Sequence, residues 1–559
     1  MTNNICVSRA LVKVGIAGSL VWMASVATAQ NVAKKDTTLN RTVVVEQEYN
    51  PDINDAIKIN ILPAIEEPTV TKKQIQYDKS AVSNPAIPKP SMGIIVGKEE
   101  KEKPSQGYAR LGYGNDNKVD AQVNYLFYLS PKDRLTVHGG MDGFKETLTR
   151  PANLYRGEDG DWKARYYRAG GGFDYLHQFN KVDFDLSGRL QQANFNYQYP
   201  LMNNLSTDKQ KHTAGELHIG VKSTDETWPF SFAAETNLLT FGKKYSVNGE
   251  AVKETIARTK AMVKGQIDDL QSISIAMQMD NFFYNSQAED YTSLQMNPFY
   301  EYANDSWKLR VGAHVDLSFG FDKGVRMSPD LEVNYLITDS YILYAQAKGG
   351  KTLNDFRTTE KVHLYSTPEN VARVFDSYNL LNAKVGFKAS PTEGLWFNLF
   401  GGYNIVANDI SPICQPDSTI TFAQGETKAM TVGAALTYDY KDIFSFSTLA
   451  EFYKWSNSSK EFINQKPKFQ FSADGSVKVT KKLSLNAGYH YVHRATASIN
   501  SLEYSMPNIS NLHAGVAYNL YKGISLYAQF DNILNSDNQY YCCYPAETFS
   551  FIGGFNFKF

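Results

Sequence analysis

The sequence has no run of about 18 apolar residues beyond residue 29, and it has almost no net charge. A helix that crosses a membrane needs about 20 such residues, so we expect no helical membrane span in the mature chain. The 57 Lys and Arg residues are balanced by 58 Asp and Glu residues, which gives a formal net charge of -1. This balance provides no electrostatic basis for binding nucleic acid.

Cysteine is scarce, and its positions fit no metal or disulfide pattern. Of the four cysteines, Cys6 lies near the N-terminus, and Cys414, Cys542 and Cys543 follow far along the chain. Three late cysteines without Cys-x-x-Cys spacing describe neither a disulfide framework nor a zinc site, although one bridge from Cys414 to Cys542 or Cys543 remains open. The HExxH, GxSxG and P-loop patterns are absent as well. The sequence therefore predicts no metal and no cofactor.

Two histidines are the strongest candidates for catalysis. His314 lies two residues before Asp316, and His490 follows Ser484 and Asn486 in one alternating stretch. A general base needs a nucleophile held close to it, and polar residues two apart on one strand occur in any hydrated wall. We predict no catalytic residues and no enzyme activity.

Other polar patterns also have a structural explanation. Gly170, Gly171 and Gly172 lie inside a predicted strand, where a phosphate-binding loop would need a helix to follow. They are better explained by strand curvature or a closely packed neighbour. A second set of polar residues recurs at every second position and would share one face of a strand: Arg326, Ser328, Asp330, Glu332 and Asn334. These side chains would either select a solute or simply line a hydrated wall, and we favour the hydrated wall.

The first 29 residues are typical of a secretory signal peptide. Arg9 and Lys13 precede an apolar stretch over residues 14–27, and Ala27-Thr28-Ala29 forms a cleavage site before Gln30. The pattern predicts export from the cytoplasm.

Residues 30–105 differ in composition from the rest of the chain. They contain seven of the 20 prolines, and their only aromatic residues are Tyr49 and Tyr77. Such a segment has too little apolar surface for a core of its own. We interpret it as an extended arm, periplasmic or lumen-filling, that orders only against a partner or the barrel; a disordered leader is the alternative. A short stretch within it is a possible contact for a periplasmic partner: Thr42, Val43, Val44, Val45 and Glu46.

From residue 106 onward, apolar and polar residues alternate. In residues 483–491, for example, Leu483, Leu485 and Ala487 fall on one face, opposite Ser484 and Asn486. A period of two is typical of a β-strand with one apolar and one polar face. Lipid on the apolar face explains a mean hydropathy of -0.39 in a chain with 35 Tyr and 32 Phe.

Short and long connections alternate along the same region. Short turns at residues 130–134, 180–181 and 268–270 are separated by longer connections such as residues 146–161 and 199–209. This pattern is typical of an antiparallel up-and-down β-barrel in the outer membrane. We predict an all-β transmembrane barrel of about 22 strands over residues 106–559. Its weakest strands are 252–267 and 468–480, and its longer connections include 354–373, 409–427, 456–465, 496–508 and 534–546.

The chain ends on a strand that places aromatic rings on one face. Ser550, Ile552 and Asn556 fall on the opposite face. A terminal aromatic strand is shared by outer-membrane barrels as a signal for the insertion machinery. We predict this role for Phe549, Phe551, Phe555, Phe557 and Phe559.

The end of the chain resembles the C-terminal barrel of TonB-dependent receptors. A strand ending in residues 530–534 (Phe-Asp-Asn-Ile-Leu) precedes a loop with Tyr540, Tyr541, Tyr544 and Pro545 and then the aromatic strand. Members of that family carry a plug domain before the barrel, and residues 30–105 are too few and too rich in proline to form one. The resemblance implies the fold of a transporter. It also implies that a short segment of the chain engages TonB, and residues 42–46 resemble such a segment.

A barrel of 22 strands has a backbone diameter of about 44 Å, so an empty lumen would leak. The arm, the loops or another protein must fill it. We expect transport of a solute across the outer membrane. The alternative is a scaffold or assembly-complex subunit that does not transport and binds periplasmic proteins or surface lipoproteins.

The same patterns predict location and partners. We expect the protein in the outer membrane of a Gram-negative bacterium, with both the arm and the C-terminus in the periplasm. Its partners would be outer-membrane lipid, the barrel-insertion machinery and periplasmic or surface lipoproteins, with no nucleic acid.

Overall fold

The structure is a computed structural model that describes most of the chain from residue 105 onward. The described residues are 105–150, 160–198, 208–246, 251–285, 288–320, 324–367, 374–415, 420–456, 465–495, 497–499 and 502–559. The predicted signal peptide (1–29), nearly all of the arm and the segment Thr42 to Glu46 lie outside them. These three expectations remain predictions.

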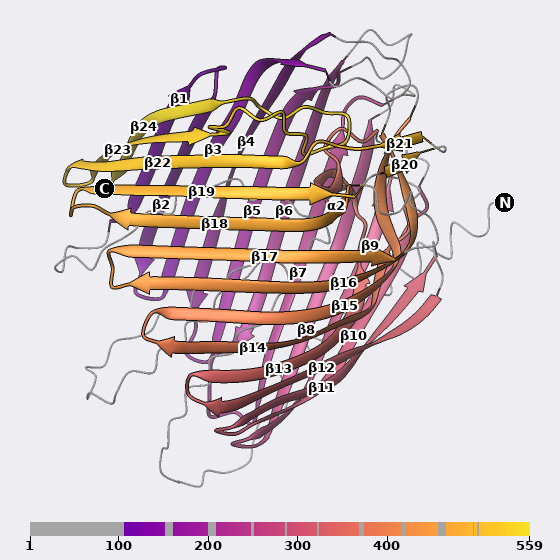
Figure 1. The fold of residues 1–559 in the computed structure, drawn as a ribbon. Coiled ribbons are helices and arrows are strands. Elements are labelled where there is room, and N and C mark those ends of the chain that lie inside the picture. The colour runs from indigo at the N-terminus through magenta and orange to yellow at the C-terminus, as the bar shows by residue number, and fades with distance from the viewer. Residues whose placement is uncertain are drawn as a thin grey trace. The chain divides into compact units, whose positions relative to one another are not determined.

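The described chain forms one closed ring of 22 antiparallel strands (Figure 1). Each strand of the ring pairs with the ring strands before and after it in the chain, and the first strand pairs with the last to close the ring. Closure leaves no unpaired edge, which a barrel in lipid requires. The predicted all-β antiparallel barrel of 22 strands is confirmed.

The strands of the first half have these bounds: β1 (Gly107–Gly114), β2 (Val119–Ser130), β3 (Asp133–Thr149), β4 (Asp161–Gln178), β5 (Val182–Asn196), β6 (Lys209–Ser223), β7 (Phe230–Lys243), β8 (Val252–Asp268), β9 (Gln271–Tyr284), β10 (Tyr291–Ala303), β11 (Trp307–Phe319), β12 (Gly324–Thr338) and β13 (Tyr341–Thr352).

The second half continues with helix α2 (Phe356–Val362), β14 (Ser377–Thr392), β15 (Leu395–Cys414), β16 (Ile420–Tyr440), β17 (Phe444–Ser456), β18 (Pro467–Lys478), β19 (Leu483–Arg494), β22 (Ile509–Tyr521), β23 (Ile524–Asp531) and β24 (Ser550–Lys558). The short hairpin β20 (Ala497–Ile499) and β21 (Leu502–Tyr504) stands outside the ring. No helix among the described residues is long and apolar enough to cross a membrane.

Alternation sorts each strand into an outer apolar face and an inner polar face. On β2 and β3, Val123, Val137 and Met141 are exposed on the apolar face. The residues between them, such as Asn124 and His138, lie opposite each other on the polar face. Side chains of period two on a closed sheet produce this division, so the ring has an apolar outside and a polar lumen.

Two sequence expectations need correction or completion. The predicted long connection over residues 409–427 is instead a continuation of β15 and β16, which pair from Asp409↔Gly425 to Cys414↔Ile420. The pairing of β15 with β16 shifts register after Val406, where Asn408 adopts the left-handed conformation, and then resumes at Asp409. This bulge interrupts the alternation, which is why the sequence indicated a loop there. The two weak strands, by contrast, are present as β8 and β18.

The two ends of the ring differ in their connections. One end carries the short turns, from β2–β3 through β22–β23, and we call it the short-turn rim. The other carries the longer connections, including the 353–376 connection with α2 and the 532–549 connection, and we call it the mouth. The predicted alternation of short and long connections is thus present.

The C-terminal residue takes part in closing the ring. Phe559 N donates to Gly107 O at 3.0 Å, and Gly107 N donates to Phe559 O at 2.7 Å. The Phe559 ring stacks on the Tyr125 ring, with centroids 5.8 Å apart. A Cβ at Gly107 would lie 2.2 Å from that ring, so a larger residue there would displace the Phe559 side chain.

Candidate functional site

A cavity of about 450 Å³ opens on the lumen wall of β1 to β5. Cavities of roughly 300–1,000 Å³ hold small molecules in proteins. Its polar lining combines both charges with hydroxyl and amide groups. The side chains are Tyr108, Asp120, Gln122, Asn124, His138, Asp142, Arg168 and Gln191.

Glycines form the floor of this wall cavity. Gly140 on β3 pairs with Gly170 on β4, and the neighbouring pair is Gly139 with Gly171. A Cβ at Gly170 would lie 2.8 Å from the Leu190 carbonyl oxygen. The glycine run noted in the sequence therefore admits a close neighbour and leaves the wall without side chains, and a strand lies on both sides of it.

Ion pairs between neighbouring strands neutralise the charges of the cavity. Arg110 Nε lies 2.8 Å from Asp120 Oδ2, and Arg168 Nη2 lies 2.9 Å from Asp142 Oδ1. His138 Nδ1 lies 3.3 Å from Asp174 Oδ2. These paired groups present donors and acceptors together, a combination suited to a polar solute rather than to an ion of one sign.

A second lattice of ion pairs crosses the opposite wall. Lys264 and Arg310 both contact Glu301, at 3.1 and 3.4 Å, and Arg310 Nε lies 2.8 Å from Asp330. Glu332 pairs with Lys348 at 2.8 Å. The acidic residues predicted to line the wall at 330 and 332 are thus held in pairs, as the hydrated-wall interpretation expects.

Each of the two histidines lies opposite a serine on a neighbouring strand, His314 opposite Ser328 and His490 opposite Ser472. His314 Nε2 lies 3.5 Å from Asn297 Nδ2, and Asn297 donates to Asp330 at 3.0 Å. The register places His490 opposite Ser472 and Asn511. Ser328 Oγ and His490 Nδ1 have no hydrogen-bond partner among the described residues, whereas a base that activates a serine holds its hydroxyl in such a bond. These contacts therefore support the interpretation of both histidines as wall residues. Within the described ranges, no three His, Cys, Asp or Glu side chains are grouped to hold a metal ion.

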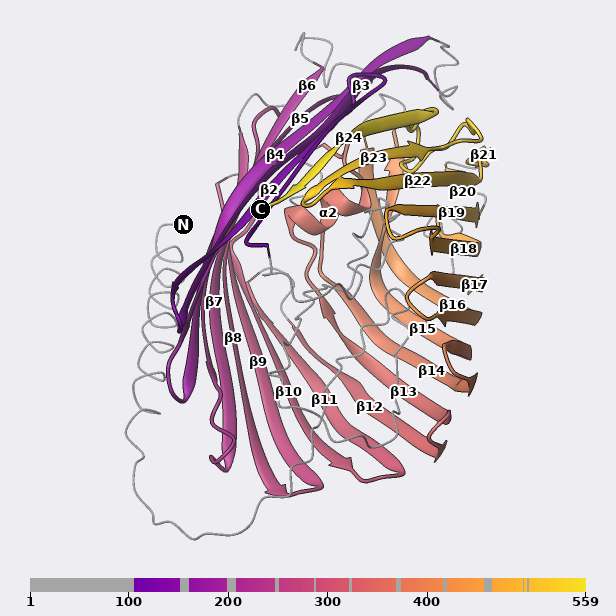
Figure 2. The same ribbon diagram turned by 90° about the vertical axis from the view of Figure 1, so that its left-hand side faces the viewer.

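The loop between β13 and β14 crosses the mouth. Its helix α2 begins at an Asp355 cap, whose Oδ1 accepts from Thr358 N at 2.7 Å. In Figure 2, α2 lies within the ring of strands. We call residues 353–376 the helix loop.

Contacts from α2 fix the helix loop to β6, β7 and β8. Arg357 donates to Gly215 O at 2.5 Å and to Thr240 O at 3.1 Å. Glu360 Oε1 lies 2.6 Å from His212 Nδ1. Phe356 N donates to Glu254 Oε1 at 3.1 Å.

The far part of the helix loop reaches β16. Phe375 N donates to Gln424 Oε1 at 2.8 Å, and Thr367 N donates to Ile420 O at 3.5 Å. Since β6 and β16 stand ten positions apart in the ring of 22, the loop ties nearly opposite sides of the barrel. At its base, Lys351 Nζ pairs with Asp376 Oδ2 at 2.7 Å, and both side chains are buried.

The connection between β23 and β24, residues 532–549, meets the helix loop over the lumen. We call it the C-terminal loop. Tyr365 and Tyr544 stack with centroids 3.8 Å apart and planes at 3°. Trp162 meets both rings edge-on, at 5.7 and 5.5 Å. His363 Nε2 lies 3.2 Å from the Cys542 carbonyl oxygen.

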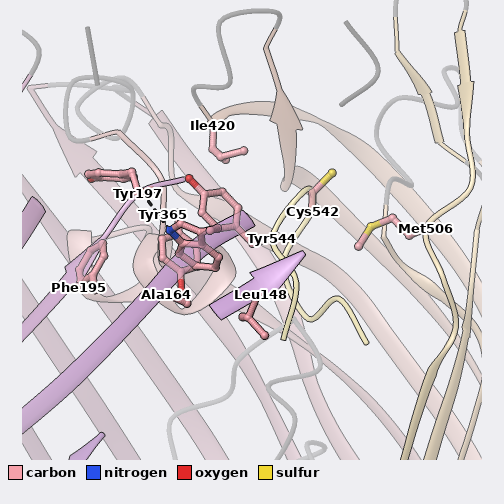
Figure 3. Packing of buried hydrophobic residues seen from close by; sticks show 10 residues of the cluster. Leu148, Ala164, Phe195, Tyr197, Tyr365, Ile420, Met506, Cys542 and Tyr544 are labelled. Atoms are coloured by element: carbon pink, nitrogen blue, oxygen red, sulfur yellow. Dashed lines mark hydrogen bonds between the residues drawn. The ribbon is translucent and has the colours of Figure 1, made fainter. Parts of the chain in front are cut away.

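A buried apolar cluster joins both loops to β3, β4, β5 and β16 (Figure 3). We call it the mouth core. Aromatic pairs of this kind add to the stability from burial alone. Its members are Leu148, Trp162, Ala164, Phe195, Tyr197, Tyr365, Ile420, Met506, Cys542 and Tyr544.

Burial controls the ionisation of His363 in the mouth core. The side chain is fully buried, and desolvation lowers its pKa to about 3. In the neutral ring, Nε2–H donates to the Cys542 carbonyl. Nδ1 has no hydrogen-bond partner among the described residues. The adjacent Cys542 and Cys543 Sγ atoms lie 3.6 Å apart; the side chain of Cys414 is outside the described set, so a bridge to it stays a prediction.

The predicted aromatic face of the last strand is present. Phe549, Phe551, Phe555 and Phe559 are exposed, whereas Ser550, Ile552 and Asn556 opposite them are buried. Phe557 is half-buried and lies opposite Ala109 and Ile524. Their role in membrane insertion remains a prediction.

Sequence reasoning missed the mouth core. A cap at Asp355 followed by apolar residues at 356 and 362 signals a short helix, and that signal was available. The core itself joins residues up to 396 positions apart, from Leu148 to Tyr544, and no local pattern indicates such a contact.

Solved structures share this barrel, although no family profile and no curated protein sequence matches the chain. The FrpB iron transporter from Neisseria meningitidis aligns with a TM-score of 0.66 at 9% identity over 82% of each chain. A mutant ferric enterobactin receptor from Pseudomonas aeruginosa, in complex with enterobactin, gives 0.63 at 10% identity over 82% of each chain. The siderophore receptor PirA from Acinetobacter baumannii gives 0.62 at 9% identity over 82% of this chain and 81% of its own.

These similarities are at the level of fold. They agree with the closed antiparallel ring of 22 strands found here. The chain is therefore a closed β-barrel whose fold resembles the 22-strand barrel of TonB-dependent receptors.

Proposed function

We propose that this protein carries a small polar solute across the outer membrane through the barrel lumen. The observation that supports this function best is the wall cavity of about 450 Å³, lined by paired charges and amides. It lies in a closed barrel whose structural neighbours include an iron transporter and siderophore receptors. Paired donors and acceptors favour a neutral or zwitterionic solute.

The two mouth loops would act as the outer barrier. They bury an aromatic core across the lumen, so a solute enters only when the contacts between Tyr365 and Tyr544 separate. Residues 30–105 would form an arm on the periplasmic side, with Thr42 to Glu46 as its contact for a periplasmic partner. In this arrangement both chain ends lie in the periplasm.

A second candidate function is a scaffold that does not transport. The feature that favours it is the mouth core itself, because a mouth held by a buried core is built for stability. Such a barrel would hold periplasmic proteins or surface lipoproteins in a complex.

Purification and conductance separate the two functions. The full chain is purified in mild detergent and placed in planar bilayers, beside a variant that lacks residues 30–105. Transport predicts a barrel that purifies alone and passes ions, with more frequent openings after the deletion. Stoichiometric co-purifying proteins together with silent bilayers in both forms would contradict transport and support the scaffold.

A further inference from the structure

The short-turn rim is divided into an acidic half and a basic half. Five consecutive turns, from β6–β7 to β14–β15, carry six acidic residues and neither Lys nor Arg, and Asp268, the last residue of β8, adjoins them. We call them the acidic arc: Asp225, Glu226, Asp268, Asp269, Asp305, Asp339 and Glu393.

The other five turns carry the opposite charge. We call their lysines the basic arc. Asp442 is the single acid within these turns, and Asp133, the first residue of β3, adjoins them. The basic arc consists of Lys132, Lys181, Lys441, Lys481, Lys482 and Lys522.

The charges of the acidic arc are mostly left in water. Six of the seven acids are exposed, and Asp225, the half-buried one, pairs with Lys181 at 2.7 Å where the two arcs meet. Asp268 accepts from Gln271 Nε2 at 2.6 Å and from Leu270 N at 2.8 Å, and neither donor is charged. One exposed cation, Lys308, lies near this arc as the second residue of β11. Turns about 10 Å apart lie within one Debye length, so their fields add.

The chain enters the barrel in the middle of the basic arc. Gly107 begins β1 and is bonded to Phe559, between the β22–β23 turn and the β2–β3 turn. The sequence before it is charge-segregated too. Residues 68–97 contain Lys72, Lys73, Lys79 and Lys89 against Asp78, whereas residues 46–67 contain six acids against Lys58. The basic stretch is repelled where the chain enters and attracted to the opposite side of the rim.

We propose that residues 68–97 bind the acidic arc of the same barrel. The reach is sufficient, because the 18 residues from Lys89 to Gly107 extend up to about 60 Å and the opening is about 44 Å across. Each exposed ion pair is weak, but a tethered segment has an effective concentration in the millimolar range. The arrangement does not depend on which solute passes or whether any does.

Tyr77 and Tyr49 are the only aromatic residues of the arm and form a matched pair of probe positions. Tyr77 lies in the basic stretch, and Tyr49 lies in the acidic stretch. Each is replaced in the full chain by the photo-crosslinking residue p-benzoylphenylalanine, and adducts are mapped by mass spectrometry. The proposal expects adducts from position 77 on the turns of the acidic arc and none there from position 49. Adducts from position 77 on the basic arc, on a second copy or on another protein alone would overturn it.

Charge reversal tests the electrostatic cause. D268K/D269K/D305K should reduce the adduct from position 77 by about tenfold, and the matched variant K441E/K481E/K482E should leave it unchanged or raise it. With the turn residues unchanged, 0.5 M salt should reduce the adduct from position 77 by a similar factor. This second test does not depend on a charge-reversed barrel folding correctly. An adduct that survives both the reversal and the salt would refute the proposal.

Discussion

At the mouth, two long loops bury an aromatic core, and the charged pair Lys351–Asp376 is buried with them. At the short-turn rim, the connections have only two to six residues, and most of their charged side chains are exposed. Burial makes the mouth depend on packing and desolvation, which salt hardly affects. Exposure makes the rim depend on long-range charge, which salt weakens. One barrel thus presents a packed end and an electrostatic end.

The largest effect is expected at the seam of the rim. Phe559→Asp places a charge beside Tyr125 and Gly107, where the ring of strands closes. We expect the folded barrel to be nearly absent from the outer membrane, with Phe559→Trp close to the wild type. Heat-modifiable mobility on gels and surface protease accessibility measure this. Normal surface levels of the Asp variant would contradict the closing role of the last strand.

Breaking the buried pair at the base of the helix loop should be the next largest effect. Lys351→Met leaves Asp376 buried without its cation, and loss of one partner of a buried pair costs about 3–5 kcal/mol. Denaturant titration of the mouth, followed by loop proteolysis, measures the loss. The double variant K351M/D376L is the control and should recover most of the stability. If the double variant is as unstable as K351M, the unpaired charge is not the cause.

Removing a ring from the mouth core should loosen both loops. Tyr365 is 7% exposed and touches Tyr544 and Trp162, so Tyr365→Ala should cost about 3 kcal/mol. Proteolysis of residues 532–549 should become faster. Tyr113→Ala, at a ring that is 62% exposed, is the control and should change little. Equal rates in both variants would show that the core does not hold the loops.

Acid should weaken the mouth through His363. Its pKa is about 3 in the closed loops and about 6.5 when the loops are open to water. Only the open form binds a proton between these values, so closure is fully stable above about pH 7 and loses about 2 kcal/mol by pH 5. Trp162 fluorescence against pH measures the opening, and His363→Gln should abolish the dependence. The same pH profile in that variant would assign the effect to another group.

The smallest effect is expected from an ion pair at the rim whose lysine is exposed and whose aspartate is half-buried. Lys181→Gln removes the contact with Asp225, whose pKa the lysine lowers to about 2 through a hydrogen bond. Exposed pairs contribute little, so the thermal unfolding midpoint should not change measurably. A clear drop would mean that the rim, too, is held by local pairs rather than by its overall field.

The fold could be predicted from the sequence because a barrel repeats one local pattern. Alternation and short turns indicated about 22 strands, and even the weakest predicted strands, 252–267 and 468–480, are present as β8 and β18. The exception over residues 409–427 arose where a bulge interrupted the alternation, and pairing with β16 restored the strand.

The mouth could not be predicted, since its contacts depend on which strands face each other across the lumen. Tyr365 meets Tyr544 only because the ring brings β13 and β24 to a common opening. The rim required the strand order as well: its acidic and basic turns form two arcs only once the ring is closed.

Conductance of the Tyr365→Ala barrel in planar bilayers tests most directly whether packing of the mouth loops closes this barrel. It is compared with the unmodified barrel in the full chain and in the form lacking residues 30–105. A loss of about 3 kcal/mol predicts an open probability about a hundredfold higher in at least the shortened form, with the same change at low and high salt. Unchanged conductance in both forms would contradict closure by the mouth core.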